Sequence, residues 1–231
     1  MGVTRFCVHP EAVRELPRVG GTKDVDIERV LALEPDLVIG NCEENTREVF
    51  DALEAHVPVY AGFPRTVDEA LEDVSRIGRL LGVELAAARW RAGADKARAD
   101  LKQEVAERGF FRYGYLIWRQ PWMTISNDTF IASMLREAGG INVFADHESR
   151  FPVLQGNEFG AVGLDLLFLS SEPFPFREEH AAEIAGVSGL LRGQVRFVDG
   201  EYCSWHGVRM SAAFEHLAHC LREGWSLTPV R

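Results

Sequence analysis

Residues 26–40 read Asp-Ile-Glu-Arg-Val-Leu-Ala-Leu-Glu-Pro-Asp-Leu-Val-Ile-Gly, a short helical pattern followed by an apolar run. Residues 155–169 repeat this unit as Gln-Gly-Asn-Glu-Phe-Gly-Ala-Val-Gly-Leu-Asp-Leu-Leu-Phe-Leu. In each copy a glutamate, Glu28 or Glu158, lies near the start of the helix, and the apolar run is typical of a buried parallel strand. The repeat indicates two α/β halves, although any doubly wound protein can produce such units by chance.

The chain has 231 residues, which is enough for one large α/β domain or two small lobes. Its apolar fraction of 46% and charged fraction of 26% are those of a globular protein. The net charge of −10 argues against nucleic-acid binding, which needs clustered lysine and arginine. No apolar run reaches the roughly 20 residues of a membrane span, and residues 1–6 lack the pattern of a secretory signal.

Strands and helices are expected to alternate along the chain, which favours parallel sheets covered by helices on both faces. The expected strands are residues 36–40, 57–61, 113–118, 164–169 and 195–198. The expected helices are residues 44–54, 66–81, 84–108, 178–185 and 208–222, together with one that is capped by Asn127 or Asp128 and stops at Gly139. Thr66 and Glu69 have the spacing of a capping box.

The expected helix at residues 84–108 differs from the others in its length and composition. It is rich in alanine and charged residues, contains no proline and ends at Gly109. At 1.5 Å per residue it would be roughly 35 Å long, enough to join two lobes. We therefore expect an N-terminal lobe at residues 1–83, a bridging helix at 84–108 and a C-terminal lobe at 109–231. The alternative is an ordinary surface helix of one domain.

Signatures of enzymes and metal sites are weak in this sequence. The chain lacks the G-x-S-x-G elbow, the G-x-x-x-x-G-K-[ST] phosphate loop and the H-E-x-x-H zinc motif. His216 and Cys220 lie one helical turn apart, but zinc needs three or four such ligands, so we expect no metal site. The four cysteines are far apart in the sequence and are expected to be free, buried thiols.

Ordered motifs over nearly the whole chain identify a family. They are Phe6-Cys-Val-His-Pro10, Gly20-Gly-Thr-Lys23, residues 27–40, Tyr115-Leu-Ile-Trp-Arg119, Pro121-Trp-Met-Thr124, Gly139-Gly-Ile-Asn-Val-Phe144, Ser170-Ser-Glu-Pro-Phe-Pro-Phe176 and Asp199-Gly-Glu-Tyr-Cys-Ser-Trp205. With these motifs the chain resembles the helical-backbone (class III) substrate-binding proteins of ABC importers, which carry cobalamin, ferric siderophores and haem. The likeness points particularly to the cobalamin-binding type.

The resemblance implies an α/β fold with two Rossmann-like lobes, parallel sheets and one long bridging helix. Family members normally begin with a further strand and helix, so the first strand of the N-terminal lobe is expected to be missing. The family is periplasmic or extracytoplasmic. Because no signal peptide is visible in this chain, a cytoplasmic protein is an alternative.

The resemblance also implies a function without catalysis. We expect a monomer, without a tightly bound cofactor, that holds a corrinoid (a cobalt chelate) or a ferric chelate in the cleft between its lobes. Glu28 and Glu158 match the glutamates that dock family members on arginines of the permease, which works with an ATPase. The alternatives are a ferric-siderophore or haem carrier of the same fold, and a cytoplasmic protein or enzyme of corrinoid or metallocofactor salvage.

Candidate ligand-binding residues are aromatic or polar residues at strand ends and in cleft loops of the family. They are Phe6, Thr22, Asn41, Arg119, Trp122, Met123, Phe151, Tyr202, Trp205, His206 and Arg209. Trp118 is expected in the core instead, because it lies inside a strand pattern. Arg119, Arg150 and Arg209 are candidate anion anchors, with salt bridging to neighbouring acids as the alternative. Several cobalamin binders have tryptophan where this chain has Thr22 and Asn41, which leaves room for a smaller corrinoid.

Overall fold

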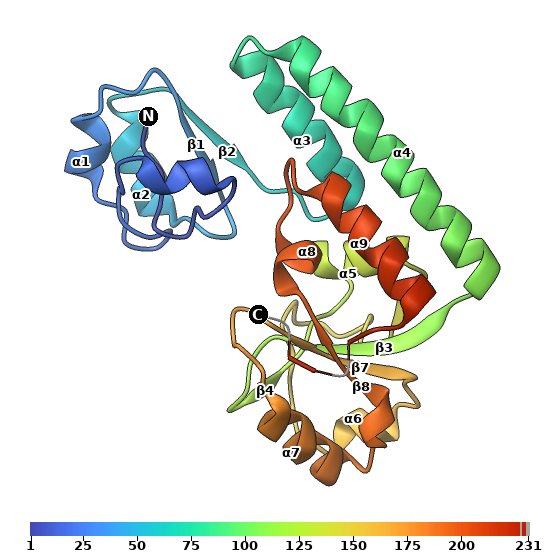
Figure 1. Cartoon of the computed structure of the whole chain (residues 1–231). Helices are drawn as coiled ribbons and strands as arrows, with labels where there is room; N and C mark the ends of the chain where they lie inside the picture. The colour runs from blue at the N-terminus through green and yellow to red at the C-terminus, as the bar shows by residue number, and fades with distance from the viewer. Residues whose placement is uncertain (227, 230–231) are drawn as a thin grey trace. The chain divides into compact units, whose positions relative to one another are not determined.

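The computed structural model describes residues 1–226 and 228–229 (Figure 1). The chain divides into two compact units, Met1–Phe63 and Pro64–Arg231. Each unit is an α/β structure with parallel strands, as the sequence predicted.

The division between the units precedes the predicted lobe boundary at residue 83. Helix α3 (Val67–Leu80) packs against α4 (Glu84–Arg108), and α4 packs in turn against α5 (Phe130–Glu137). Both long helices therefore belong to the second unit. The three-part division into two lobes and a bridging helix stays a prediction.

The first unit is built around one pair of parallel strands, β1 (Val38–Asn41) and β2 (Val59–Gly62). Two helices accompany the strands, α1 (Ile27–Leu31) and α2 (Arg47–Glu54), and a 3-10 helix, η1, spans Glu11–Glu15. Its small core consists of Val19, Val30, Leu53 and Val57. Both strands begin two residues later than predicted.

The second unit contains a parallel sheet with the strand order β5-β3-β7-β8. The strands are β3 (Phe111–Leu116), β5 (Gly140–Asn142), β7 (Leu166–Ser170) and β8 (Val195–Val198). The remaining elements are the antiparallel pair β4 (Trp122–Met123) and β6 (Val153–Leu154), helices α6 (Glu158–Ala161), α7 (Glu178–Ser188), α8 (Gly200–Ser204) and α9 (Met210–Glu223), and the 3-10 helix η2 (Arg192–Gln194).

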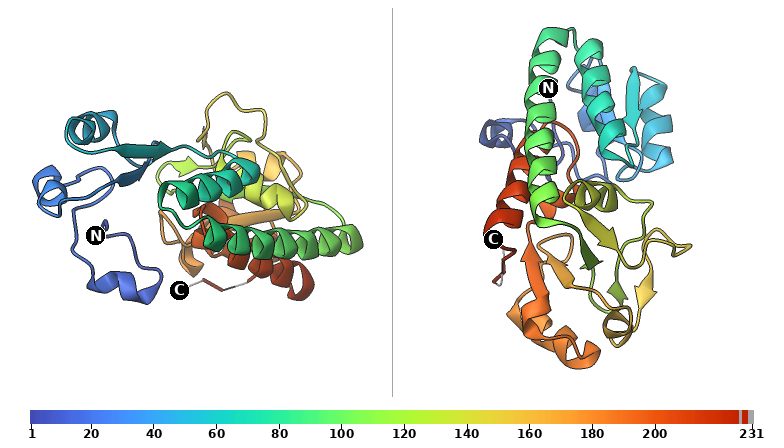
Figure 2. Two further views of the ribbon diagram at one scale, coloured as in Figure 1. Left: turned by 90° about the horizontal axis from the view of Figure 1, so that it is seen from above. Right: turned by 90° about the vertical axis from the view of Figure 1, so that its right-hand side faces the viewer.

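The sheet of the second unit separates two apolar layers, because successive side chains of a strand point to opposite faces. Tyr115 and Phe168 belong to the core cluster that also includes residues of α3, α4, α5 and α9. Leu116 and Leu169 belong to the other cluster, with Phe159 of α6 and residues of α7. Figure 2 shows α9 lying along α4, on the first of these layers. The result is a three-layer α/β unit, which is the predicted fold class.

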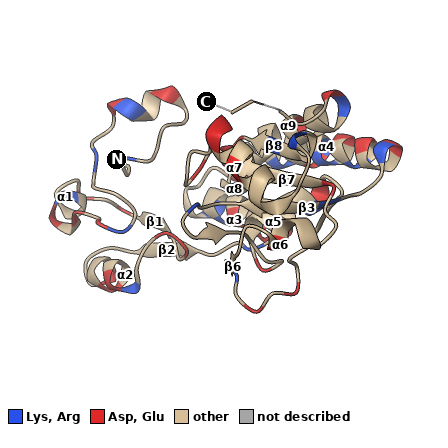
Figure 3. Ribbon diagram, turned by 90° about the horizontal axis from the view of Figure 1, so that it is seen from below, with Lys and Arg blue, Asp and Glu red and all other residues tan. Residues whose placement is uncertain are grey.

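The sequence predicted α4 with both of its bounds, Glu84 and Arg108. Its buried residues are Ala94, Ala97 and Leu101, so small side chains allow the neighbouring helices to approach closely. Charges of both signs lie along its exposed side (Figure 3), including the pairs Arg91–Asp95 and Lys96–Asp100 one turn apart. A strong local helical preference therefore coincides with tertiary packing. In the described residues, no helix combines the length and apolar character that crossing a membrane requires.

Two local predictions in the second unit were wrong. Helix α5 is capped by Thr129, whose hydroxyl accepts the N–H of Ala132 at 3.2 Å, and not by Asn127 or Asp128. Trp118 is 42% exposed, because β3 ends at Leu116 and the chain turns into β4. Its ring contacts Phe174 edge to face instead of entering the core.

Candidate functional site

The second unit offers a ligand edge where β3, β7 and β8 end. These strands are parallel and neighbouring, so their carboxyl ends lie at the same edge of the sheet. Ligands of open α/β sheets bind beyond such an edge. We call the interacting residues that follow β7 and β8 the strand-end cluster; its members are Glu172, Glu201, Tyr202, Ser204, Trp205 and Arg209.

Helix α8 places the aromatic members of the strand-end cluster. It starts directly after β8, because the Asp199 side chain caps it by accepting the N–H of Glu201 at 3.0 Å. The Arg209 guanidinium carbon lies 5.2 Å from the ring centroid of Tyr202 and 5.8 Å from that of Trp205. Arg209 also donates to a carboxylate oxygen of Glu201 at 3.0 Å. Three predicted ligand residues, Tyr202, Trp205 and Arg209, are therefore in mutual contact through the arginine.

Glu172 was not among the residues predicted from the sequence. It follows β7, and its carboxylate accepts the hydroxyl hydrogen of Ser204 at 2.6 Å and a hydrogen bond from the Trp205 side chain. Burial raises the pKa of Glu172, and these hydrogen bonds oppose the increase only in part. Its position two residues beyond an apolar strand was the signal that could have identified it.

Helix α9 contacts the strand-end cluster through His216. The ring of Tyr202 stacks on that of His216, with centroids 4.5 Å apart and an angle of 21° between the planes. His216 Nε2 lies 3.5 Å from Cys220 Sγ, which confirms that the two residues share a helix face. Burial lowers the pKa of His216. His206, in the loop before α9, contacts Phe130 edge to face at 5.6 Å.

Four other predicted ligand residues lie on or beside the β4–β6 pair. Trp122 stacks on Phe176 with an angle of 8° between the ring planes, and Arg119 lies over Trp122 at 5.9 Å. Met123 and Phe151 are partly buried against the core. Because Trp122, Met123 and Phe151 pack against the core, a packing role accounts for these three residues as well as ligand binding does.

All three candidate anion anchors form salt bridges, as the alternative predicted. Arg119 makes a bidentate pair with Glu183, at 2.7 and 3.0 Å. Arg150 contacts Asp128 at 3.5 Å, and Arg209 pairs with Glu201. Since each guanidinium already has an acidic partner, none presents an uncompensated positive charge to an anionic ligand.

In the first unit, Asn41 ends β1 and Thr22 lies in the loop before α1. The side chain of Asn45 connects them: its Nδ2 donates to the Thr22 carbonyl at 2.9 Å, and its Oδ1 accepts the Asn41 N–H at 3.0 Å. Helix α2 starts at Arg47, three residues after the predicted start. Phe6 is 55% exposed, with the Arg5 guanidinium over its ring. Ligand contact by these residues stays a prediction.

Glu28 and Glu158 are both exposed residues in the first turn of a helix. Glu158 also has a local role, because its carboxylate accepts the N–H of Gln155 at 2.6 Å. An acidic residue in the first turn is favourable in any helix. The permease-docking role of the two glutamates is therefore a prediction that the fold permits.

The four cysteines are free thiols, but their burial differs from the prediction. Cys203 and Cys220 are buried, and burial raises the pKa of the Cys220 thiol to about 11. Cys42 is exposed and Cys7 is half-buried, because the first unit has only a small core. In the described part of the chain, no group of three or more histidine, cysteine or acidic residues could hold a metal ion.

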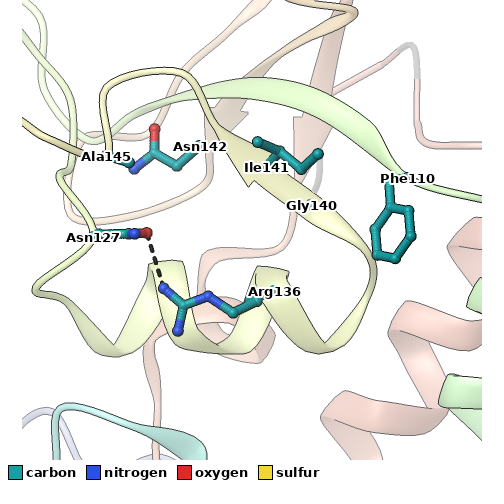
Figure 4. Close-up of a pocket in the computed structure, with 7 residues that line it drawn as sticks. All are labelled: Phe110, Asn127, Arg136, Gly140, Ile141, Asn142 and Ala145. Carbon is teal, nitrogen blue, oxygen red and sulfur yellow. Dashed lines mark hydrogen bonds between the residues drawn. The ribbon is translucent and has the colours of Figure 1, made fainter.

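A pocket of about 350 Å³ lies in the second unit beside α5 and β5 (Figure 4). It is lined by Phe110, Asn127, Arg136, Gly140, Ile141, Asn142 and Ala145. Arg136 donates to Asn127 across its polar side at 2.9 Å. None of the predicted ligand residues and no member of the strand-end cluster lines it. We therefore place the candidate site at the strand ends.

The sequence matches the periplasmic binding protein family over residues 1–185. The chain belongs to the periplasmic binding protein family. This membership confirms the resemblance that the sequence motifs indicated. A curated relative of this periplasmic binding protein is the vitamin B12-binding protein of Yersinia pestis (strain Pestoides F), 26% identical over 157 residues. The match covers 66% of this chain and 55% of the relative, so it spans just over half of that protein's length.

Solved structures of other periplasmic binding proteins share the fold. The vitamin B12-binding protein BtuF of Vibrio cholerae has a TM-score of 0.77 and 23% identity, covering 96% of this chain and 88% of that one. The heme-binding protein RhuT from Roseiflexus sp. RS-1 has a TM-score of 0.80 and 21% identity, covering 96% and 89%. These likenesses confirm the fold class.

Proposed function

We propose that this periplasmic binding protein is the substrate-binding component of an ABC importer and that its ligand is a corrinoid or a related metal chelate. One observation carries the proposal: the strand-end cluster gathers Tyr202 and Trp205 around Arg209 at the ligand edge of the sheet. A corrin ring is large, flat and mostly apolar, with polar amide edges. It needs aromatic surfaces and a few hydrogen-bonding groups, and the Yersinia relative's name supports this choice of ligand.

The proposed mechanism is capture and presentation, in which no covalent bond is made or broken. Arg209 and the aromatic side chains hold the ligand, with Phe6, Thr22 and Asn41 as predicted contributors from the first unit. Glu28 and Glu158 present the loaded protein to arginines of the permease, since a carboxylate and a guanidinium form a directional bidentate pair. The proposal includes a monomer that works outside the cytoplasm, as the family's name implies.

A haem carrier is the second candidate, favoured by His206. This residue follows Trp205 in the loop before α9 and is half-buried. A neutral imidazole is a common axial ligand of haem iron. The protein from Roseiflexus with the same fold is named as a periplasmic heme-binding protein, which supports this candidate.

Titration of the purified chain with dicyanocobinamide, cyanocobalamin, haemin and a ferric siderophore tests the proposal. We expect both corrinoids to quench tryptophan fluorescence with sub-micromolar midpoints. Binding of haemin alone would establish the second candidate, and binding of the ferric siderophore alone would contradict both. Chemical conversion of a corrinoid during incubation would indicate a salvage enzyme instead.

Two tryptophan variants locate the bound ligand. Trp205→Ala should weaken corrinoid binding at least about tenfold, because a central aromatic contact is lost. Trp225→Phe is the matched control, since Trp225 packs on Phe111 and Phe168 in the interior of the second unit. It should change the starting fluorescence and leave the midpoint unchanged. Equal effects of the two substitutions would place the ligand away from the strand-end cluster.

A further inference from the structure

Glu172 is held at the ligand edge by contacts from two strand ends. Its own N–H donates to Ser170 Oγ at 3.3 Å, and Ser170 Oγ also accepts the hydroxyl of the fully buried Tyr115 at 3.0 Å. From the C-terminal end of α8, which follows β8, Ser204 and Trp205 donate to its carboxylate. The side chain is therefore oriented by groups that belong to the rigid end of the sheet, which preorganises it for recognition.

The backbone at Gly200 leaves room for this arrangement. A Cβ at position 200 would lie 2.5 Å from Glu172 Cγ and 2.5 Å from Ser170 Oγ. Any larger residue would displace Glu172 from the start of α8. The N–H of Gly200 instead donates to Ser171 Oγ at 2.9 Å, which brings the ends of β7 and β8 together. Glycine at position 200 is therefore required for the Glu172 side chain to occupy its observed position.

The charge around Glu172 is predominantly negative. Glu201 and Asp199 are close enough to disfavour its ionisation, in addition to its burial. Arg209, the cation of the strand-end cluster, pairs with Glu201. Among residues 1–226 and 228–229, no lysine or arginine forms an ion pair with Glu172. A half-buried acid without a cation costs folding free energy, so a role in recognition would explain its presence.

We propose that Glu172 is the specificity-determining residue of the strand-end cluster, accepting N–H groups from carboxamides on the ligand and repelling ligand carboxylates. The inference rests on the proposed function and selects between its two candidate ligands. A corrinoid presents carboxamides at its edge, whereas a haem presents two propionate carboxylates. The selection is by repulsion as much as by attraction.

Carboxamides suit Glu172 in either protonation state. An amide has N–H donors for the carboxylate and a carbonyl acceptor for the protonated acid. A ligand carboxylate is compatible only with the protonated acid, and the neighbouring Glu201 and Asp199 oppose the approach of further negative charge. The acidic groups around Glu172 therefore favour binding of a corrinoid over binding of a haem at neutral pH.

The test compares dicyanocobinamide and haemin binding, by calorimetry at pH 7.5, for the intact chain and for Glu172→Gln. Glutamine keeps the size of the side chain and removes its charge. We expect the substitution to weaken cobinamide binding about threefold to tenfold and to strengthen haemin binding at least about fivefold, as the loss of a charged hydrogen bond and of a repulsion predicts. Glu179→Gln, which removes an exposed acid from α7, is the control and should change neither affinity.

The possible outcomes separate the inference from the proposed function. If the intact chain binds cobinamide and the ratio of the two affinities is the same in Glu172→Gln, the inference is overturned and the function stands. If the intact chain prefers haemin, the inference and the corrinoid assignment are overturned, and the haem carrier, the second candidate, is established. Ser204→Ala, which removes one hydrogen bond to Glu172, should shift the ratio in the same direction by a smaller factor. Circular dichroism and thermal unfolding establish that each variant is folded.

Discussion

The aromatic ring of Tyr202 stacks on the imidazole ring of His216, with the ring centroids 4.5 Å apart. His216 belongs to α9, whose buried face packs into the core, so the helix fixes the position of a predicted ligand residue. Burial disfavours the charged imidazole and lowers the pKa of His216 below its ordinary value of 6.5. The stability of this contact should therefore depend on pH.

We expect His216 to make the protein less stable in mild acid. Its pKa is lower in the folded chain, so the unfolded chain binds the proton more readily below pH 6.5. The free energy of unfolding should fall as the pH decreases from 6.5 through the folded-state pKa, by at most about 1.4 kcal/mol per pH unit. His216→Gln should remove this part of the pH dependence. Urea unfolding at several pH values measures it.

His219→Gln provides the control for this pH dependence. His219 lies on the same helix but is exposed, and its charge is only a smaller cause of the lowered pKa of His216, after burial. Its substitution should therefore change the slope of stability against pH less than His216→Gln does. If the His216 and His219 variants have identical slopes, burial of His216 does not affect its titration.

Arg98 should contribute more to stability than the other charged residues of α4. It connects three helices: it donates to Asp68 of α3 at 2.6 Å and to Glu137 of α5 at 2.7 Å. The side chains of Arg98 and Glu137 are only 16% and 14% exposed. Arg98→Met should lower the free energy of unfolding by about 1.5–3 kcal/mol, because Glu137 loses its hydrogen-bonded partner and keeps only the more distant Lys102, at 3.9 Å. Chemical denaturation measures the change.

The comparison for Arg98 is Lys96→Met, which breaks the exposed pair with Asp100 on the same helix. It should have a much smaller effect than Arg98→Met, because water screens an exposed ion pair. The double variant Arg98→Met/Glu137→Leu should recover much of the loss, since removing both charges leaves no buried ion without a partner. Equal effects of the Arg98 and Lys96 substitutions would show that the Arg98 contacts stabilise the protein no more than an exposed ion pair does.

Gly160 marks a close approach between α6 and the end of α7. A Cβ at this position would lie 1.9 Å from the carbonyl oxygen of Ser188, and backbone cannot yield as a flexible side chain does. Gly160→Ala should destabilise the protein by about 1–3 kcal/mol. Gly186→Ala on α7 meets nothing within 4 Å and should stabilise it by about 0.5–1 kcal/mol. Thermal unfolding that ranks the two variants the other way would contradict the packing described for α6.

Charge reversal of Glu28 and Glu158 should abolish import and leave ligand affinity unchanged. The measurement is uptake of labelled cobinamide by cells that require this chain, beside calorimetry on the purified variants. Because Glu158 accepts the N–H of Gln155, Glu158→Gln keeps this hydrogen bond and separates loss of charge from loss of the hydrogen bond. Reversal of the exposed Glu54 and Glu179 is the matched control. Lost affinity in the Glu28 and Glu158 variants would place those carboxylates in the ligand site.

Local sequence determined much of the secondary structure of this protein. The bounds of α4 and the capping box between Thr66 and Glu69 depend on residues that are near one another in the chain. The strand β8 was also predicted with its observed bounds, Val195 and Val198. In each case helix propensity, a cap or an apolar run acts within a few residues, so the pattern alone was sufficient.

Tertiary structure decided which side chains form the candidate site. Trp118 is exposed because β3 stops two residues before it, and Thr129 caps α5 in place of its polar neighbours. Glu172 meets Ser204, 32 positions away, only because β7 and β8 pair in parallel and Gly200 admits the carboxylate. Sequence patterns specify each element from local interactions, whereas contacts between distant residues depend on how the strands pair.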